Sequence, residues 1–487
     1  MPKAHTPAIL ALDVGSSSAR ALLFDTAGQP IPDRGAQIAY SVLATPDGGA
    51  ELDMDQLAAW VEECIDTVLA GLDARLDIRA VACSTLVGNL LGVDAAGRPS
   101  TPLWIWADTR AAAAARELRA EGLQDSWQRT GAPLHSAYWP ARFRWLAAEH
   151  PELLARTSRW LTLGEYLTER WLGRPLLSLS VAAWNGLLDR SSQTWDAALL
   201  ERLPIRRDQL GTPQADHQPH VGLRPDYARR WPALSTAAWL APIGDGLGSS
   251  WGVGAVQPDR VAINLGTSGA MRVLLPAGGP LPPGLWSYRV DGRSELVGGA
   301  LSNGGNLVDW AADSLKLPAL DELEDDLAAL APAGHGLTVL PFWAGQRAPD
   351  YDDDARAVIH GLTLSTSPMH ILQAMMEAVA YSFGHIYACL LPLLPAEHTI
   401  IAGGGALEHS PAWGQMICDV LGRPLRLSGV AEATARGTAL YAIQALGLGA
   451  APEPPPTTLC RPDPARHERY AQASAAMLDL QRRLAAP

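Results

Sequence analysis

The chain has 487 residues, a hydrophobic content of 48% and a formal net charge of −13. This length exceeds what one hydrophobic core supports and predicts two large domains, while the acidic charge argues against the basic surface that nucleic-acid binding requires. Lys3 and Lys316 are the only lysines and no Gly-Lys pair occurs, which excludes a phosphate-binding loop of the Gly-Lys-Ser/Thr type.

The cysteines and the apolar segments indicate the compartment. The five cysteines are scattered, odd in number and form no C-x-x-C pair, so the pattern favours a reducing compartment over a disulfide framework or a metal cluster. The first residues enter a predicted strand without an apolar signal segment. The most apolar stretch, 370–395, carries Glu377, His385 and Pro392 and is typical of a buried helix. We therefore expect a cytoplasmic protein with no membrane or nucleic-acid partner, and leave open whether it forms a homodimer.

Strands and helices alternate along the first half. The segments 8–14 (AILALDV) and 19–25 (ARALLFD) read as strands on either side of a turn. Residues 53–71 begin with an acidic turn and continue at helical period, and 78–84 read as a buried strand. This alternation predicts an α/β fold. Residues 203–235 are rich in Pro, Arg and Asp and predict an irregular surface excursion.

The second half repeats the alternation after a glycine-dense break at 242–255. Residues 403–422 predict a glycine turn that opens a helix, 425–429 a strand and 433–447 another helix. A final amphipathic helix is predicted over 466–484.

One strand–turn–strand unit occurs twice. In an ungapped alignment, Gly15 pairs with Gly266, Ser16 with Thr267, Ser17 with Ser268, Ala19 with Ala270, and Asp13 with Asn264. A Gly-Ser/Thr-Ser turn after a strand exposes backbone N–H groups and hydroxyls that suit phosphate oxygens, although a single such turn is more often only a tight turn. Two turns on facing domains would hold one polyphosphate from both sides, and the single carboxylate, Asp13, would hold Mg²⁺ or its waters.

Three further segments carry candidate chemistry, each with a plainer alternative. Asp245 lies between glycines in IGDGLGSS and is either a general base at a cleft or the side chain of an Asx turn. Residues 400–410 (IIAGGGALEHS) are either a nucleotide contact or a loop. In 101–111 (TPLWIWADTRA), which clusters Trp104, Trp106, Asp108 and Arg110, the side chains of Asp108 and Arg110 either bind sugar hydroxyls or belong to a helix start with an Asp cap. Arg347 precedes an acidic run typical of a solvated loop, and His135 and His370 are expected to be structural.

The order of these motifs resembles the FGGY carbohydrate kinases over residues 8–447. The most specific segment is 357–377 (AVIHGLTLSTSPMHILQAMME), which is similar to the C-terminal signature of that family along its length. DVGSSSAR, WADTR, IGDG…GVGA, LGTSGAMR, LSNGGNLVDW, GQRAPDY and AGGGA follow the family order as well.

The resemblance implies an α/β fold of two actin/hexokinase-like (ribonuclease H-like) ATPase domains with a cleft between them. Residues 1–246 would form the N-terminal domain for sugar and phosphate, and 247–487 the C-terminal domain for the nucleotide. The resemblance also implies ATP and Mg²⁺, Asp245 as the base and Asp13 as the metal-organising carboxylate. The residues implied at ATP are Gly15, Ser16, Ser17, Ser18, Arg20, Gly266, Thr267, Ser268, Gly305, Gln346, Gly403, Gly404 and Gly405, and those implied at the sugar are Val87, Gly88, Asn89, Trp106, Asp108 and Asp245.

Within the family, WADTR and LGTSGAMR look closest to the gluconokinase branch. The sugar segment 84–94 (STLVGNLLGVD) lacks the Met-His pair usual there, Gln346 stands where Glu is usual, and Leu177 and Ser178 lie where an Asp is expected. The expected function is an ATP-dependent kinase acting on gluconate. The alternatives are a pentulose kinase for D-ribulose or D-xylulose, and a non-catalytic actin-like sugar sensor.

Overall fold

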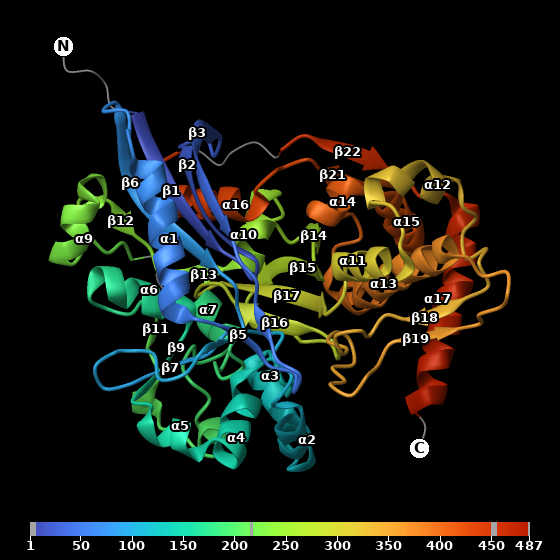
Figure 1. Cartoon of the computed structure of the whole chain (residues 1–487), viewed down its shortest axis with the longest axis horizontal. Coiled ribbons are helices and arrows are strands. Elements are labelled where there is room, and N and C mark those ends of the chain that lie inside the picture. Colours follow the sequence, from blue (N-terminus) through green and yellow to red (C-terminus); the bar gives the residue numbers. More distant parts are fainter. Residues whose placement is uncertain (1–5, 215–217, 450–454, 486–487) are drawn as a thin grey trace.

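The computed structural model describes residues 6–214, 218–449 and 455–485, and it contains two large mixed sheets (Figure 1). In the first sheet, β1 (Thr6–Val14) pairs antiparallel with β2 (Ser18–Asp25) and parallel with β6 (Leu76–Thr85). The outer strands are β3 (Pro30–Ala39), which pairs with β2, and β12 (Ala238–Trp239) and β13 (Ile243–Gly244), which both pair with β6.

The second sheet repeats this pattern. Its strand β14 (Arg260–Leu265) pairs antiparallel with β15 (Gly269–Pro276) and parallel with β20 (Thr399–Gly403). The repetition confirms the predicted α/β architecture built on a duplicated unit. The remaining strands of this sheet are β16 (Trp286–Arg289), β17 (Ser294–Leu301), β21 (Leu425–Ser428) and β22 (Thr457–Cys460).

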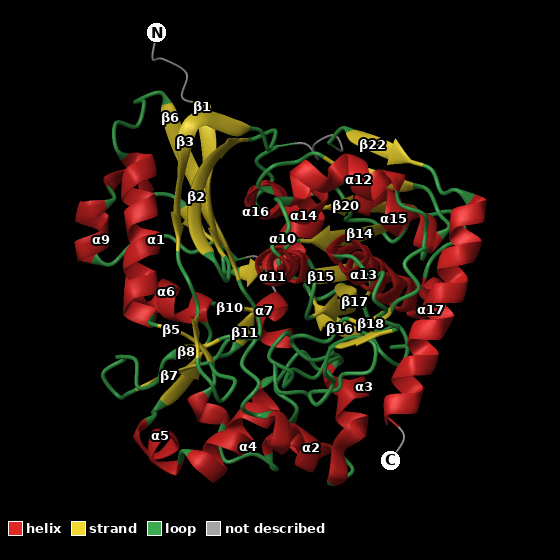
Figure 2. Cartoon of the chain, turned by 45° about the vertical axis from the view of Figure 1, so that its right-hand side comes forward, coloured by secondary structure: helices red, strands yellow, loops and turns green. Residues whose placement is uncertain are grey.

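The first sheet is covered on both faces by helices from distant parts of the chain. Helix α1 (Met54–Leu69) packs against β2 and β3, whereas α16 (Ala433–Ala445) packs against β1, β2 and β6. Helix α10 (Asp245–Gly252) lies along α16 at a very short distance (Figure 2), since a methyl group on Gly437 would lie 1.8 Å from the carbonyl oxygen of Gly248. This close packing fixes the start of α10 relative to β1.

The segment between the sheets, residues 86–235, consists of short elements, of which some pack against the first sheet and others onto the edge of the second. Trp127 donates to the carbonyl of Leu285 (2.9 Å), and the hydroxyls of Tyr138 and Tyr288 lie 2.5 Å apart. Residues 203–235 are largely irregular, as predicted, but they also bury Trp231 and Leu234. The helices here are α2 (Ala112–Ala120), α3 (Ser126–Thr130), α4 (Trp139–Glu149), α5 (Pro151–Arg156), α6 (Leu163–Leu172), α7 (Leu179–Ala183), α8 (Ala197–Leu200) and α9 (Pro225–Arg230).

Small strands complete this segment and the preceding loop. They are β4 (Leu43–Ala44), β5 (Ala50–Leu52), β7 (Leu91–Val93), β8 (Leu103–Trp104), β9 (Arg159–Leu161), β10 (Leu177–Ser178) and β11 (Pro213–Gln214).

Helix α13 (Pro368–Leu390) confirms the predicted buried helix. It is long and apolar enough to cross a membrane by composition, but 72% of its most apolar window is buried inside the protein, as in a core helix. The predicted helix at 403–422 divides into α14 (Gly405–His409) and α15 (Pro411–Leu421), because the proline fixes its own φ and disfavours the helical conformation at Ser410.

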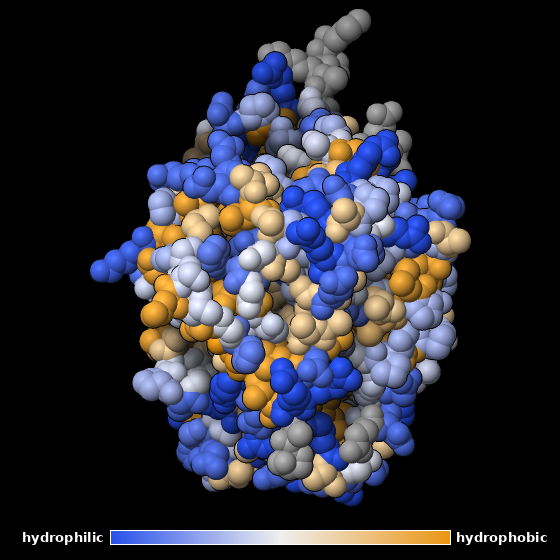
Figure 3. Space-filling view, turned by 90° about the vertical axis from the view of Figure 1, so that its right-hand side faces the viewer, coloured by the Kyte–Doolittle hydropathy of each residue, from blue (hydrophilic) through white to orange (hydrophobic). Residues whose placement is uncertain are grey.

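The other C-terminal elements are α11 (Gly305–Leu315), α12 (Glu324–Ala329), β18 (Thr338–Leu340), β19 (Val358–His360) and α17 (Pro464–Ala485). The face toward α17 is mostly hydrophilic with scattered apolar patches (Figure 3).

Candidate active site

The first duplicated turn follows β1 and has a buried carboxylate at its base. Asp13 is 4% exposed, accepts a hydrogen bond from the hydroxyl of Ser84 (2.9 Å) and lies 3.5 Å from the guanidinium of Arg20. Burial raises the pKa of Asp13 to about 6, although Ser84 and Arg20 act to lower it. Its charge is therefore only partly compensated by the protein. Arg20 in turn lies 3.3 Å from Glu432, just before α16.

The two turns share a backbone pattern but differ by one residue in length. The N–H of Gly15 donates to the carbonyl of Ser18, and the N–H of Gly266 donates to the carbonyl of Ser268, both at 3.0 Å. The strand register therefore places Arg20 opposite Asp13, and Ala270 opposite Asn264. The ungapped pairing of Ala19 with Ala270 is wrong by one residue, because the first turn contains one residue more.

Glycines bring two other segments against the second turn. The N–H of Gly305, the first residue of α11, donates to the carbonyl of Gly266 (2.7 Å). Gly403 pairs with Asn264 across β20 and β14, and Gly404 has a φ of +109° with no room for a side chain, since a methyl group would lie 2.5 Å from the carbonyl of Leu265. Gly305, Gly403 and Gly404, three of the predicted nucleotide residues of the C-terminal half, thus lie around one turn.

Both turns face the same cleft, which has a volume of about 960 Å³. Ser16 and Ser17 line it from the first turn, and Thr267 lines it from the second. Asn306 of α11 and the ring of Trp343 complete the second wall. The arrangement offers hydroxyls and backbone N–H groups to one anionic chain from two sides.

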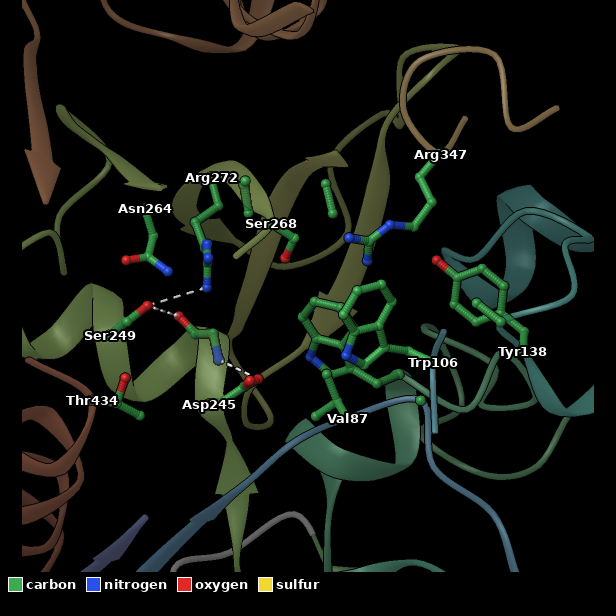
Figure 4. Close-up of a pocket in the computed structure, with 17 residues that line it drawn as sticks. Val87, Trp106, Tyr138, Asp245, Ser249, Asn264, Ser268, Arg272, Arg347 and Thr434 are labelled. Atoms are coloured by element: carbon green, nitrogen blue, oxygen red, sulfur yellow. Dashed lines mark hydrogen bonds between the residues drawn. The ribbon is translucent and has the colours of Figure 1, made fainter. Parts of the chain in front are cut away.

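Asp245 is the first residue of α10 and lines a smaller cavity of about 130 Å³ (Figure 4). Its carboxylate accepts a hydrogen bond from the N–H of Gly246 (2.7 Å). Burial raises the pKa of Asp245, while Arg272, the Gly246 N–H and Arg347 act in the opposite direction. A partly buried carboxylate with a raised pKa can accept a proton from a hydroxyl.

Two arginines enter this cavity from different sides. Arg272 comes from β15, is 4% exposed and donates to the hydroxyl of Ser249 (3.3 Å), while its Nε has no partner. Arg347 lies with its guanidinium 4.4 Å from the ring centroid of Trp106, and its Nε also has no partner. In Figure 4, Arg347 approaches from the side of Trp106 and Tyr138, whereas Arg272 approaches from the side of Asn264.

The structure brings part of the predicted sugar set to the cavity. Val87, Gly88 and Trp106 line it together with Asp245, but Asn89 and Asp108 do not. Asn89 is 1% exposed because its amide donates to the carbonyl of Leu86 (2.6 Å) and accepts from the N–H of Leu163 (2.8 Å). Asp108 is 3% exposed and binds Arg110 at 2.5 Å. Both side chains support loops behind the cavity wall.

Gln346 is held away from both turns. Its amide donates to Asp350 (2.8 Å) and accepts from Gln481 of α17 (3.0 Å). The side chain predicted to lie at the nucleotide therefore anchors the loop that carries Arg347.

Sequence reasoning missed Ser84, Tyr40, Glu432 and Arg272. Ser84 and Glu432 lie far from Asp13 and Arg20 in the sequence, so no local pattern indicated them. A signal for Arg272 was present. It stands two residues after Ala270 in a strand, and residues two apart face the same side, so the charge falls on the side that lines the cavity.

The described residues contain no cluster of three or more His, Cys, Asp or Glu side chains suited to a metal ion. Mg²⁺, however, is typically bound by one or two carboxylates together with substrate phosphates. A buried Asp13 with incomplete charge compensation, placed beside a turn of hydroxyls and backbone N–H groups that suits phosphate, fits that ligand set.

Comparisons with known proteins decide the family. Models of the N-terminal and C-terminal domains of the FGGY family of carbohydrate kinases match residues 8–221 and 261–446. The chain belongs to the FGGY family of carbohydrate kinases. Its fold is accordingly the two-domain FGGY kinase fold that the motif order implied.

The chain is similar to relatives of more than one specificity. It is 24% identical to the gluconokinase of Bacillus subtilis (strain 168), over 91% of this chain and 88% of the relative. The solved gluconate kinase of Lactobacillus acidophilus superposes with a TM-score of 0.89 at 25% identity, and the ligand-bound xylulose kinase of the same organism with 0.89 at 26%, each over 99% of both chains. The protein is a carbohydrate kinase, a phosphotransferase with a hydroxyl acceptor and ATP as the donor.

Proposed function

We propose that this protein is a cytoplasmic kinase that transfers the γ-phosphate of ATP to a hydroxyl group of a sugar acid, with gluconate as the leading substrate. The observation that carries the choice of substrate is the charge of the cavity. Its lining includes two arginines, Arg272 and Arg347, and one carboxylate, Asp245. Burial lowers the pKa of Arg272 only to about 10, so it stays protonated at neutral pH. A cavity with one excess positive charge favours a carboxylate-bearing sugar over a neutral ketose.

The positions of the charged groups suggest how the acid is oriented. Arg347 lies at the Trp106–Tyr138 side of the cavity, away from Asn264 (Figure 4). We place the substrate carboxylate at Arg347 and the reacting hydroxyl at Asp245. Arg272 then stabilises the Asp245 carboxylate before it accepts the proton, since it lowers the pKa of that group.

In the reaction, Asp245 accepts the proton of the hydroxyl while the hydroxyl oxygen forms a bond to the γ-phosphorus. The bond from that phosphorus to the bridging oxygen breaks, and ADP leaves. The turns at Gly15 and Gly266 hold the phosphate chain in line, with the N-terminal part of the chain (1–246) supplying sugar and phosphate contacts and the C-terminal part (247–487) the nucleotide contacts. Mg²⁺ held by Asp13 would neutralise phosphate oxygens.

A sugar panel with an ADP-release assay tests the proposal. Gluconate, D-ribulose, D-xylulose and glycerol are compared for the wild type and for Arg347→Met. We expect the highest kcat/KM with gluconate, and a loss of about 10- to 100-fold for gluconate in Arg347→Met with a smaller loss for the ketoses. Arg116→Met, which removes a surface arginine that is 48% exposed, is the matched control.

Two outcomes would replace the proposal. A higher kcat/KM with D-xylulose or D-ribulose than with gluconate would assign the cavity to a pentulose. Absence of ADP release with every sugar, combined with measurable sugar binding, would assign the protein to the sensor class.

A further inference from the structure

A buried carboxylate outside the reacting groups connects the two walls of the sugar cavity. Asp353 is 7% exposed and lies in the loop between β18 and β19. The hydroxyl of Ser136 donates to its Oδ1 at 2.5 Å, and the ring of His135 lies 3.1 Å from the same oxygen. Ser136 and His135 belong to the segment between α3 and α4, which is far away in the sequence.

The protonation of His135 is fixed by its surroundings. Burial lowers the pKa of His135 to about 4, although Asp353 acts to raise it, so the ring is neutral at pH 7. The N–H of Ala137 donates to Nδ1 (3.2 Å), which places the ring proton on Nε2, where it is donated to Asp353. The carboxylate therefore accepts from both side chains of the opposite wall.

Ser136 and Asp353 each lie a few residues along the chain from residues that line the sugar cavity. On one side, Ala137 and Tyr138 follow Ser136 directly and line the cavity. On the other side, the N–H of Tyr351 donates to the carbonyl of Arg347 (2.8 Å), so the turn that begins at Arg347 is closed just before Asp353. A change at Asp353 is transmitted to both walls over a few residues.

We propose that Asp353 is a positioning residue that sets the distance between Arg347 and the Ala137–Tyr138 wall, and so the affinity for the sugar. The inference rests on the proposed function in treating this cavity as the sugar site. Asp353 does not contact the substrate. It acts through the hydrogen bonds from Ser136 and His135, which an asparagine oxygen accepts equally well. Asp353 also lies 3.6 Å from the guanidinium of Arg119 of α2, an ion pair that asparagine does not keep.

The test compares Asp353→Ala, Asp353→Asn and Asp354→Ala. Asp354 is the matched control, because it is the neighbouring carboxylate and also pairs with an arginine of α2, Arg116 (2.6 Å), but both side chains are about half exposed. Asp353→Ala is expected to raise KM for the sugar about tenfold, with KM for ATP and kcat changed by less than about threefold. Asp353→Asn is expected to recover most of the affinity. Asp354→Ala is expected to leave KM for the sugar unchanged, because Asp354 lines the larger cleft and not the sugar cavity.

The proposal is overturned if Asp353→Ala leaves KM for the sugar unchanged, if Asp354→Ala has the same effect, or if Asp353→Asn is as impaired as Asp353→Ala. Ser136→Ala, expected to raise the same KM by about threefold, replaces Asp353→Ala should that variant not fold, and an unchanged KM in Ser136→Ala would also overturn it. The measurements use whichever sugar of the panel the wild type prefers. Sugar binding is also followed by the change in total tryptophan fluorescence, to which Trp106 and Trp184 contribute from the wall of the cavity. If the gluconate assignment is wrong, the sugar preference of the wild type shows it. If the role of Asp353 is wrong, only the ratio of KM for the sugar between variant and wild type shows it.

Discussion

The two duplicated turns have the same backbone and different chemistry. In both, the carbonyl of the first glycine accepts one hydrogen bond. At Gly15 the donor is the hydroxyl of Tyr40 (2.6 Å), whereas at Gly266 it is the N–H of Gly305 at the start of α11 (2.7 Å). The first turn is thus supported by a side chain and the second by a helix terminus.

The charges around the two turns differ as well. Asp13, Arg20 and Glu432 form a chain of ion pairs at the first turn, while Asn264 and Ala270 occupy the positions of Asp13 and Arg20 at the second. The helix end at the second turn contributes only partial positive charge. The duplication thus supplies two turns of similar backbone, both proposed to bind phosphate, and only the first of them carries charged side chains.

The largest expected effect concerns Asp245, which belongs to neither turn. Asp245→Asn removes the group that accepts the proton and keeps the hydrogen bond from Gly246, so kcat is expected to fall by about 10³-fold. Affinity for ATP should stay within about threefold, because both turns are intact. Turnover is measured by ADP release and ATP binding by calorimetry, and turnover like that of the wild type would remove Asp245 from the role of base.

Asp13→Asn makes the first turn resemble the second. It is expected to lower kcat/KM for ATP by about 100-fold or more, because the carboxylate proposed to hold Mg²⁺ is lost. The variant should nevertheless unfold at a higher temperature than the wild type at pH 7. The native pKa of Asp13 is raised to about 6, so the stability linked to its protonation is present below about pH 4 and lost as the pH rises through 6.

The gain in the free energy of unfolding is at most about 3 kcal/mol, because burial raises the pKa of Asp13 from 3.8 to about 6. Thermal unfolding of the variant and the wild type at pH 4.5 and pH 7 measures it, and an equal difference at both pH values would contradict the assignment. Ser84→Ala is the control, since it removes a hydrogen bond that lowers the pKa of Asp13 without removing the carboxylate.

The same carboxylate predicts a pH profile for the wild type. Because kcat/KM reports the free enzyme, its value for ATP should fall about tenfold for each unit below pH 6. The pKa of Asp245 is also raised by burial, so its protonation acts on the rate in the same direction. Initial rates between pH 5 and 8 locate the limb, and a midpoint near pH 4 would mean that neither group controls binding or turnover.

Asn264→Asp gives the second turn the carboxylate that the first turn has at Asp13. A second carboxylate at the second turn would repel the phosphate chain. Ala270 rather than an arginine lies opposite it in the strand register, and Arg272, which approaches from the side of Asn264, would offset only part of the repulsion, so KM for ATP is expected to rise about tenfold. Asn264→Leu, which removes polarity without adding charge, separates repulsion from lost hydrogen bonding. Equal KM values for the two variants would show that charge at this turn is unimportant.

The sequence predicted the local structure around those residues of the candidate site that lie on short continuous segments. Each of these segments adjoins a strand or helix that the spacing of apolar residues predicts. They are the two turns, Asp13, Asp245 and the glycines at 403–405. The sequence could not predict that Asn89 and Asp108 turn away from the cavity, because both are held by partners remote in the sequence, Leu163 and the N–H of Ala50 (3.2 Å). Glu432 was missed for the same reason, since α16 returns from the C-terminal part of the chain to the first sheet.

The smallest expected effect is at Tyr40. Tyr40→Phe removes the donor to the carbonyl of Gly15 but keeps the ring stacked on Trp60 (5.2 Å between centroids). A hydrogen bond of this kind contributes about 1 kcal/mol, so KM for ATP should rise about three- to fivefold with kcat almost unchanged. Tyr166→Phe, which removes a hydroxyl bonded to Asp55 (2.6 Å) on the same domain, is the control and should leave KM for ATP unchanged. If both variants behave alike, the tyrosine does not shape the first turn. The asymmetry between the turns would then lie in Asp13, Arg20 and Glu432 alone.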